Sequence, residues 1–169
     1  MIRPTDQDDV AAVIETYADM VRRICCLHLL NRTDVEDVFQ EVFLQYFLHR
    51  DSMADEPHRK AWLCRVTFNR CKDFNRKIRR RREIGLDQME IPCETKEESE
   101  VMSRVLSLPP REKTVVYLHY CEGMTIPEIA GLMHKNVNSV YSWLHRAKKT
   151  LKRQLEADAM EEGEVKTQC

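Results

Sequence analysis

The sequence predicts an all-α protein made of two small helical domains joined by an acidic linker. Only four of the 169 residues are glycine, and few segments alternate apolar and polar residues as a half-buried strand would. Apolar residues instead recur every three or four positions, which is the repeat of an amphipathic helix. Charge also changes abruptly: residues 59–82 hold eleven Lys or Arg and one acid, whereas residues 83–100 hold seven acids and one Lys. Such segregation favours two domains over one.

The domain boundaries are expected where the charge changes: a first domain at 6–82, a linker at 83–100, a second domain at 101–156 and an acidic tail at 157–169. The first helix is expected from Asp6 to about Leu29. Its apolar residues share one face and form a candidate core: Val10, Val13, Ile14, Tyr17, Val21 and Ile24. The tail shows no clear apolar repeat, so we expect it to fray.

The second helix is expected from Thr33 to about His49. Thr33 and Glu36 form a possible capping box, in which each side chain bonds the other residue's backbone N–H. Seven large apolar residues follow within thirteen positions: Val35, Val38, Phe39, Val42, Phe43, Tyr46 and Phe47. One core stripe does not need so many, so some of the phenylalanines face a partner, or else the helix lies at the centre of a small bundle. The bundle is the simpler of these two expectations.

The third helix is expected from Pro57, which suits a first helical turn, to about Arg80. One face is expected to be buried and carries Leu63, Thr67, Cys71, Phe74 and Ile78. The other carries Trp62, Arg65, Asn69, Lys72 and Arg76. An aromatic ring and an amide on one face suit an unpaired base, and the basic end at 76–82 suits phosphate. A buried Trp62 and a solvated basic run fit the same residues.

Residues 125–152 predict two helices joined by a tight turn. Thr125 and Glu128 form a second possible capping box, and Asn136 can cap the second of these helices. The first helix has an apolar face of Ile126, Ile129, Ala130 and Met133. The second has an apolar stripe of Val137, Val140, Leu144, Ala147, Leu151 and Leu155.

The outer face of that second helix has the chemistry of a DNA-reading surface. It is expected to present Asn136, Asn138, Ser139, Ser142, Trp143, Arg146 and Lys149. Asn and Arg make bidentate bonds to base edges, Ser serves several bases, and Lys or Arg neutralises phosphate. No acid occurs between His134 and Arg153. An ordinary amphipathic hairpin shares the apolar pattern, but this charge favours nucleic acid.

Other classes of protein find less support. The chain has neither a run of about 18 apolar residues nor a signal peptide, so we expect a cytoplasmic protein. Seven cysteines without a CxxC pair suit reduced, packed thiols, and the CxxH spacing of Cys25 and His28 is only half of a zinc site. No metal and no cofactor is expected. No spaced catalytic signature occurs, so no catalytic residue is assigned.

Three blocks together resemble a bacterial RNA polymerase sigma factor of the small extracytoplasmic-function (ECF) group. They are DVEDVFQEVFLQYF (34–47), AWLCRVTFNRCKDFNRK (61–77) and the helix-turn-helix, in this order and at this spacing. The resemblance spans about residues 8–153 and implies a sigma-2 bundle of three to four helices, an extended linker and a sigma-4 helix-turn-helix domain. Leu108, Pro109 and Arg111 would open sigma-4. Pro109 and Pro110 would end whatever precedes them, and Gly123 would end the next helix in a left-handed conformation.

The resemblance also implies roles for residues. Core polymerase would be held through Asp37, Gln40 and Glu41. The minus-10 element would be opened and read by Trp62, Arg65, Asn69, Lys72, Asp73 and Arg76. The minus-35 element would be read by Asn136, Asn138, Ser139, Ser142, Trp143, Arg146 and Lys149. The family further implies an anti-sigma factor as a partner.

The alternative is a free-standing helix-turn-helix regulator that binds promoter DNA without polymerase. Such a regulator would have no use for the Asp37–Glu41 cluster or for the face around Asn69, so the sigma interpretation is preferred. Three positions depart from the family. His134 stands at the turn position where the family usually has Gly, and Tyr141 and Trp143 stand where basic residues are more usual.

Overall fold

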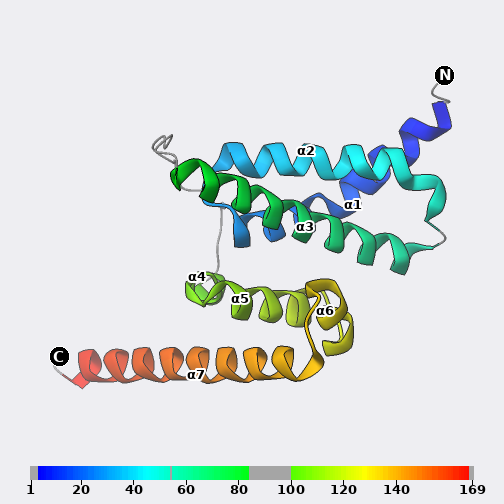
Figure 1. The fold of residues 1–169 in the computed structure, drawn as a ribbon. Coiled ribbons are helices and arrows are strands. Elements are labelled where there is room, and N and C mark those ends of the chain that lie inside the picture. The colour runs from blue at the N-terminus through cyan, green and yellow to red at the C-terminus, as the bar shows by residue number, and fades with distance from the viewer. Residues whose placement is uncertain (1–3, 54, 84–99, 168–169) are drawn as a thin grey trace. The chain divides into compact units, whose positions relative to one another are not determined.

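The structure is a computed structural model that describes residues 4–53, 55–83 and 100–167, and Figure 1 shows its fold. Every regular element among these residues is helical, which confirms the predicted fold class. The chain divides into two compact units, Met1–Thr95 and Lys96–Cys169. The predicted linker lies almost wholly outside the described residues. Within the described part of the chain, no helix combines the length and the apolar character needed to cross a membrane.

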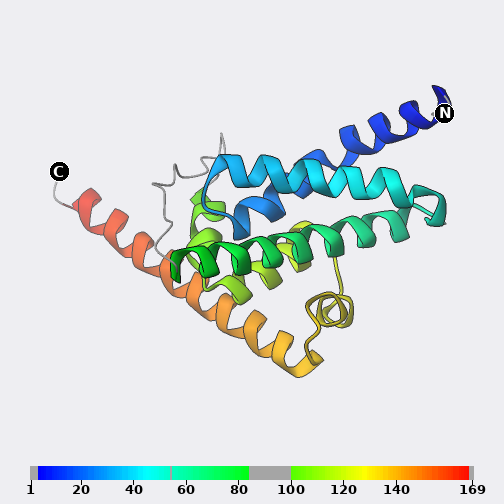
Figure 2. The ribbon, with the colours of Figure 1, turned by 45° about the horizontal axis from the view of Figure 1, so that its top comes forward.

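The described residues of unit 1 form a bundle of three helices. They are α1 (Pro4–His28), α2 (Arg32–His49) and α3 (Glu56–Glu83), with a 3-10 turn, η1 (Arg50–Ser52), between the last two. Each helix packs against the other two, as both views of the ribbon show (Figures 1 and 2). The centre of the bundle is formed by the most deeply buried side chains: Val21, Ile24, Cys25, Val38, Val42, Tyr46, Leu63, Cys64, Thr67 and Cys71.

The start of α2 differs from the expectation. Asn31, not Thr33, is its N-cap: the Asn31 side-chain oxygen accepts a hydrogen bond from the Asp34 backbone N–H at 2.8 Å. The predicted capping box of Thr33 and Glu36 is therefore wrong. Asn is at least as good an N-cap as Thr, and Glu36 is engaged elsewhere, because its carboxylate pairs with Arg22 of α1.

The phenylalanines of α2 are either buried or partly covered by an arginine of unit 1. Phe43 is buried. Phe39 is half-buried, with the guanidinium carbon of Arg22 4.3 Å from its ring centroid. Phe47 is covered in the same way by Arg50 at 4.4 Å. Cation–π contacts of this kind let a partly exposed ring remain at a surface.

The buried Tyr17 hydroxyl and the buried thiols of Cys25 and Cys71 in unit 1 are paired. Tyr17 of α1 donates its hydroxyl to Glu56 at the start of α3, and burial, together with this bond, raises the pKa of Tyr17 to about 12. The thiols of Cys25 and Cys71 are both fully buried, and their mutual hydrogen bond, with burial, raises the pKa of Cys25 far above its usual range. A protonated thiol is a weak nucleophile, so this pair acts as packed apolar groups, as the sequence predicts.

Over residues 100–167, unit 2 contains four α-helices. They are α4 (Glu100–Ser107), α5 (Pro110–Val116), α6 (Ile126–Met133) and α7 (Val137–Thr167), and α5 continues into one turn of π-helix, η2 (Tyr117–Cys121). Pro109 separates α4 from α5, as expected for a residue that lacks a backbone donor. The core is formed by Val115, Tyr117, Leu118, Ile129, Leu132, Val140, Leu144 and Ala147.

The α7 helix is longer than expected, because it continues beyond 156 to Thr167. The expectation that this segment frays is therefore wrong over 157–167. Its residues include Ala, Met and Glu, which have high intrinsic helix propensity. The end of the apolar repeat was a poor guide to the end of the helix, because residues of high helix propensity can continue a helix where the apolar repeat has ended.

The turn between α6 and α7 is fixed at both ends. The capping box of Thr125 and Glu128 is confirmed, and the hydrogen bonds from Thr125 lower the pKa of Glu128. Asn136 accepts from the Ser139 backbone N–H at 2.7 Å and so caps α7. Between them, His134 adopts a left-handed conformation, with φ 52° and ψ 49°. Backbone bonds from His134 to Gly131 and from Lys135 to Ala130 complete a Schellman motif.

Alanine substitution of two glycines of unit 2 is expected to change the free energy of unfolding in opposite directions. We expect Gly131→Ala to raise the free energy of unfolding by about 0.5–1 kcal/mol, because Gly131 lies in α6 and a Cβ there meets no atom within 4 Å. We expect Gly123→Ala to lower it by about 1–2 kcal/mol, because Gly123 has φ +70°. Urea unfolding of the full chain measures both. Equal signs for the two variants would contradict the described backbone.

Candidate partner and nucleic-acid interfaces

One exposed face of α2 carries the predicted acidic and amide residues. Asp37, Gln40 and Glu41 are all exposed, and the 100° step of a helix places them within one side. Glu41 also forms an ion pair with α3, since its Oε1 lies 3.0 Å from Nη1 of Arg70. Asp37 forms no ion pair in the described part of the chain. The face therefore presents one free acid, one amide and one tethered acid.

Two leucines that sequence reasoning missed extend this face. Leu44 is 57% exposed and Leu48 is 63% exposed. Their spacing of seven and eleven residues from Asp37 places them on the same side of α2. A helical wheel centred on Asp37 would have found them, because the seven buried candidates of α2 lie elsewhere on the wheel. The face called the α2 stripe below consists of Asp37, Gln40, Glu41, Leu44 and Leu48.

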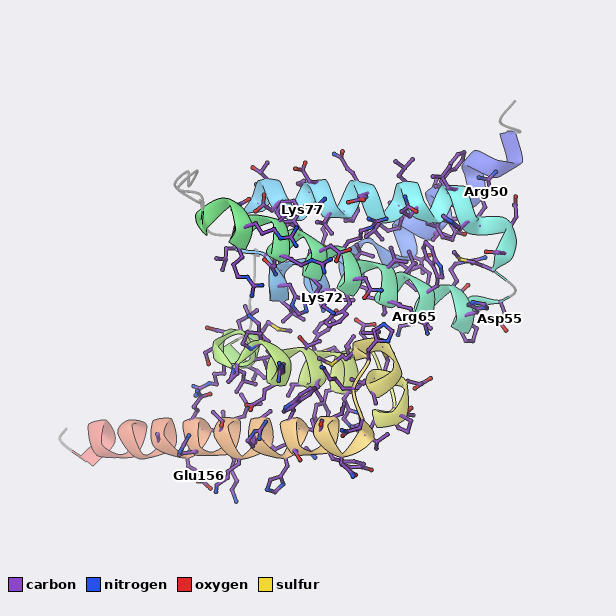
Figure 3. All side chains as sticks on the ribbon, viewed as in Figure 1. Arg50, Asp55, Arg65, Lys72, Lys77 and Glu156 are labelled. Carbon is purple, nitrogen blue, oxygen red and sulfur yellow. The ribbon has the colours of Figure 1, made fainter. Side chains whose placement is uncertain are left out.

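The predicted outer face of α3 is present in the structure. Arg65, Lys72 and Arg76 are exposed, and Asn69 and Trp62 are half-buried beside them. Arg65 and Lys72 leave the same side of α3 in Figure 3. Trp62 packs against α2. The centroid of its ring lies 6.4 Å from that of Tyr46 and 6.0 Å from that of His49.

Trp62 is therefore neither fully buried nor fully free. One side of its indole is supported by α2 and the other borders the face that contains Asn69. The expectation of a buried Trp62 is thus met only in part, and stacking on a base stays a prediction. A supported, half-exposed ring is the arrangement from which an aromatic side chain can stack on a further ring.

A cleft of about 410 Å³ lies between α2 and the C-terminal half of α3. Its lining consists of Glu41, Arg70, Asp73, Phe74, Arg76, Lys77 and Arg80. Four of these side chains are cations and two are acids, and both acids already have partners. Glu41 pairs with Arg70, and Asp73 pairs with Arg76 at 2.6 Å. The cleft therefore keeps a net positive charge, which favours an anionic backbone nearby.

The exposed face of α7 differs from the predicted set at one residue. Asn136, Asn138, Ser142 and Lys149 are exposed, and Ser139 is half-buried. Trp143, however, is only 7% exposed, so the expectation that it faces outward is wrong. It lies three residues after Val140 and four before Ala147, which are both fully buried, and Arg111 of α5 lies above its ring at 5.3 Å.

Arg146 has a partner inside unit 2. Its Nε donates to Oε1 of Glu112 on α5 at 3.0 Å, and Glu112 is only 8% exposed. The Arg146 side chain itself remains 58% exposed. Because the bond uses Nε, the Nη groups remain available to a second partner. Arg146 can thus join the two helices and still face outward.

Two exposed side chains of α7 were not in the predicted outer face. His145 lies between Ser142 and Lys149 on the outer face, at the helical spacing of that face. Tyr141 is 59% exposed. The outer face of α7 therefore contains Asn138, Tyr141, Ser142, His145, Arg146 and Lys149. No group of three His, Cys, Asp or Glu side chains among the described residues could hold a metal ion.

These interfaces define a class of protein: a two-unit helical factor with a helix-turn-helix in one unit and a basic and aromatic helix face in the other. Two family models match the chain, sigma-70 region 2 over residues 13–82 and sigma-70 region 4 over residues 98–151. The first match falls within unit 1 and the second within unit 2.

Relatives and solved structures agree with these matches. The ECF RNA polymerase sigma factor SigW of Bacillus subtilis is 24% identical, with 91% of this chain and 92% of SigW covered. CnrH, solved in complex with the cytosolic domain of CnrY, has a TM-score of 0.60 and 25% identity, with 90% of each chain covered. The sigma factor RpoE of Bartonella quintana shares the fold, with a TM-score of 0.66 at 17% identity over 89% of this chain and 98% of RpoE.

The chain belongs to the sigma-70 family, in its extracytoplasmic-function group. It is a sigma factor that associates with core RNA polymerase and directs it to promoters, rather than a free-standing regulator. Core polymerase and promoter DNA are accordingly its partners.

Proposed function

We propose that the two units divide promoter recognition between them. Unit 1 binds core polymerase through the α2 stripe and captures minus-10 DNA on the outer face of α3, and unit 2 reads minus-35 DNA with α7. The observation that carries this proposal is the outer face of α7, which is exposed, free of acids over its first four turns and anchored by a capped turn at its start. The N-terminal part of such a helix is the part that enters the major groove.

The α2 stripe suits a basic helical partner. Asp37 and Glu41 supply negative charge, and Gln40 supplies an amide. Leu44 and Leu48 add apolar area at one end of the stripe. Protein interfaces commonly combine a desolvated apolar part with complementary charge that selects and orients the partner. The tether from Arg70 fixes the Glu41 carboxylate in place before a partner arrives, which lowers the cost of ordering it.

The outer face of α3 suits an unstacked base. Asn69 offers donors and an acceptor to a base edge, and Trp62 offers a ring supported by α2. Arg65, Lys72 and Arg76 supply positive charge for the strand that carries the base, and Asp73 orients Arg76. Extruding a base costs a few kcal/mol of stacking and pairing, and contacts to the extruded base offset that cost. On this proposal, promoter opening is a capture step that requires no catalytic residue.

The outer face of α7 suits duplex DNA. Asn138, Ser139 and Ser142 lie in the first two turns and Asn136 caps them, where base edges are reached, and Lys149 lies further along, where it meets phosphate. Arg146 uses Nε for Glu112 and directs its remaining donors to the DNA. Trp143 supports this face from below rather than contacting DNA itself.

We further infer that the chain has no catalytic site of its own and acts in the cytoplasm, where core polymerase carries out the chemistry. We also infer that an anti-sigma factor regulates it. The support for this partner is that RpoE was solved in complex with the anti-sigma factor NepR and that CnrH was solved with the cytosolic domain of CnrY.

The test of the proposed function is transcription in vitro with purified core polymerase, the full chain and genomic fragments, followed by mapping of the start sites. We expect initiation at a small set of promoters that share two sequence elements upstream of the start. Initiation that does not depend on the added chain would overturn the proposal. So would tight promoter binding by the chain alone without transcription.

Charge reversal on the α2 stripe is expected to weaken binding to core polymerase. Asp37→Lys should lower the affinity about fivefold, because an exposed ion pair contributes about 0.2–1 kcal/mol and the new cation adds repulsion. Asp37 is the appropriate position because Glu41→Lys would also break the pair with Arg70. Asp19→Lys, an exposed acid of α1, is the matched control. Equal affinities of both variants for core, measured by fluorescence anisotropy, would exclude the stripe.

Loss of the Asn69 amide is expected to affect one base rather than the whole promoter. Asn69→Ala should reduce discrimination at one minus-10 position about fivefold, the effect of one hydrogen bond of about 1 kcal/mol. Lys72→Ala should instead weaken use of every base variant alike, because a phosphate contact carries no sequence information. Open-complex formation on promoters with each minus-10 base exchanged measures both effects. A uniform loss in Asn69→Ala would remove it from base reading.

A further inference from the structure

Two apolar side chains are exposed at the start of α7, although the apolar residues that follow them at 140, 144 and 147 are buried. Val137 is 38% exposed and Tyr141 is 59% exposed, whereas Val140, Leu144 and Ala147 are buried. A spacing of four residues places Val137 and Tyr141 one above the other on the same face of the helix. They form one apolar patch, called the Val137–Tyr141 patch below, within a face that is otherwise polar and basic.

Tyr141 has no polar or ring contact with the described residues of unit 2. In the described part of the chain its ring and hydroxyl make no hydrogen bond, ring contact or cation–π contact. The other tyrosines of unit 2 are engaged. Tyr117 donates to Glu122 at 2.6 Å, and Tyr120 has the Lys148 ammonium 5.5 Å from its ring centroid. Among the described residues of unit 2, Tyr141 is thus the tyrosine without a polar or ring partner.

The position of the patch points to the major groove. Asn138 and Ser142, which are exposed and follow Val137 and Tyr141 by one residue each, border the patch on the outer face of α7. The patch is therefore continuous with the surface proposed above to read the minus-35 element. In the major groove the four bases offer hydrogen-bonding groups and one apolar group, the C5 methyl of thymine. That methyl is the chemical match for an aromatic ring and a valine side chain.

We propose that the Val137–Tyr141 patch contacts a thymine methyl group in the minus-35 element and so makes thymine a preferred base there. This inference rests on the proposed function, because it requires α7 to lie in the major groove. Burial of one methyl-sized group contributes about fourfold in affinity. Asn138 and Ser142 then read the hydrogen-bonding edges of neighbouring base pairs, and the patch adds discrimination that neither of them supplies.

The test removes the methyl and nothing else. Full-length protein and core polymerase are assayed for open-complex formation on a promoter mapped as above, with each minus-35 thymine replaced in turn by deoxyuridine. We expect about fourfold weaker binding of the wild-type holoenzyme at one or two of these positions. Tyr141→Phe should keep this penalty, because the ring remains. Tyr141→Ala should bind thymine and deoxyuridine promoters equally.

Tyr120→Ala is the matched control, since Tyr120 is 57% exposed in the same unit but lies outside α7. It should keep the wild-type deoxyuridine penalty. The proposal is overturned if the wild-type holoenzyme forms open complexes but tolerates every deoxyuridine, or if Tyr141→Ala retains the penalty. A loss of core-polymerase binding in Tyr141→Ala, with the penalty unchanged, would instead assign the patch to a protein partner. Absence of transcription initiation by the wild-type holoenzyme on the unmodified promoter would contradict the proposed function itself.

Discussion

Trp143→Ala is expected to lower the free energy of unfolding of unit 2 by about 3–5 kcal/mol, the usual cost of truncating a buried large aromatic residue. The indole is only 7% exposed and lies on the core side of α7 between Val140 and Ala147. Arg111 of α5 covers its ring. Truncation would leave a cavity between α5 and α7 and remove this cation–π contact. The minus-35 element would then be lost because the helix-turn-helix is no longer held, rather than because a DNA contact is missing.

Hydrogen exchange on the full chain separates these two causes. In Trp143→Ala, amides of α5, α6 and α7 should lose protection, while amides of α1, α2 and α3 should keep it. Tyr141→Ala is the matched control on the same helix, and its exposed ring predicts a change within about 0.5 kcal/mol. Trp143→Phe should recover most of the protection. If Trp143→Ala keeps full protection but loses duplex binding, the burial described here does not explain its role.

The error over Trp143 shows where sequence patterns lose resolution. The apolar stripe of α7 was chosen by the strongest repeat, which includes Val140, Leu144 and Ala147. Trp143 lies at the edge of that stripe, about 60° from its centre on a helical wheel. Whether an edge position is covered depends on the neighbouring helix, and the neighbour is Arg111, 32 residues earlier in the chain. The same uncertainty explains why Val137 and Leu155, placed in the stripe, are in fact exposed.

Local chemistry was a better guide. The capping box of Thr125 and Glu128, the cap at Asn136 and the left-handed Gly123 are all confirmed. Each depends on backbone groups within a few residues, so the sequence contains all the partners. The N-cap of α2 was assigned to Thr33 instead of Asn31, because both residues are good caps and they lie two positions apart. Glu36, which a capping box with Thr33 requires, pairs with Arg22 instead.

Contacts between helices could not be predicted. The pair of Glu41 with Arg70 and the pair of Glu112 with Arg146 each join residues about thirty positions apart. Both include a residue that the sequence assigned to an interface. The structure thus gives Glu41 and Arg146 a second role, in holding neighbouring helices together, and a variant at either position changes the fold's stability as well as any external contact.

The Glu112–Arg146 pair gives the second large effect. Arg146→Ala is expected to lower the free energy of unfolding of unit 2 by about 1–3 kcal/mol, because it leaves the carboxylate of Glu112 without its donor. Glu112 is 8% exposed, so water replaces that donor poorly. In the double variant Glu112→Gln and Arg146→Ala, no charge is stranded, so the loss should be smaller than the sum of the two single losses. Urea unfolding of the four proteins measures this coupling.

Lys149→Ala separates stability from DNA binding on the same helix. Lys149 is exposed and forms no ion pair among the described residues. The Lys149→Ala variant should keep wild-type stability. It should reduce the slope of log affinity for minus-35 DNA against log salt concentration by about one released ion. Arg146→Ala should change both properties if its Nη groups reach phosphate, and stability alone if they do not. In the Glu112 and Arg146 cycle, additive losses of unfolding free energy would mean that the 3.0 Å contact between these residues contributes no coupling energy. The ion pair would then not stabilise unit 2.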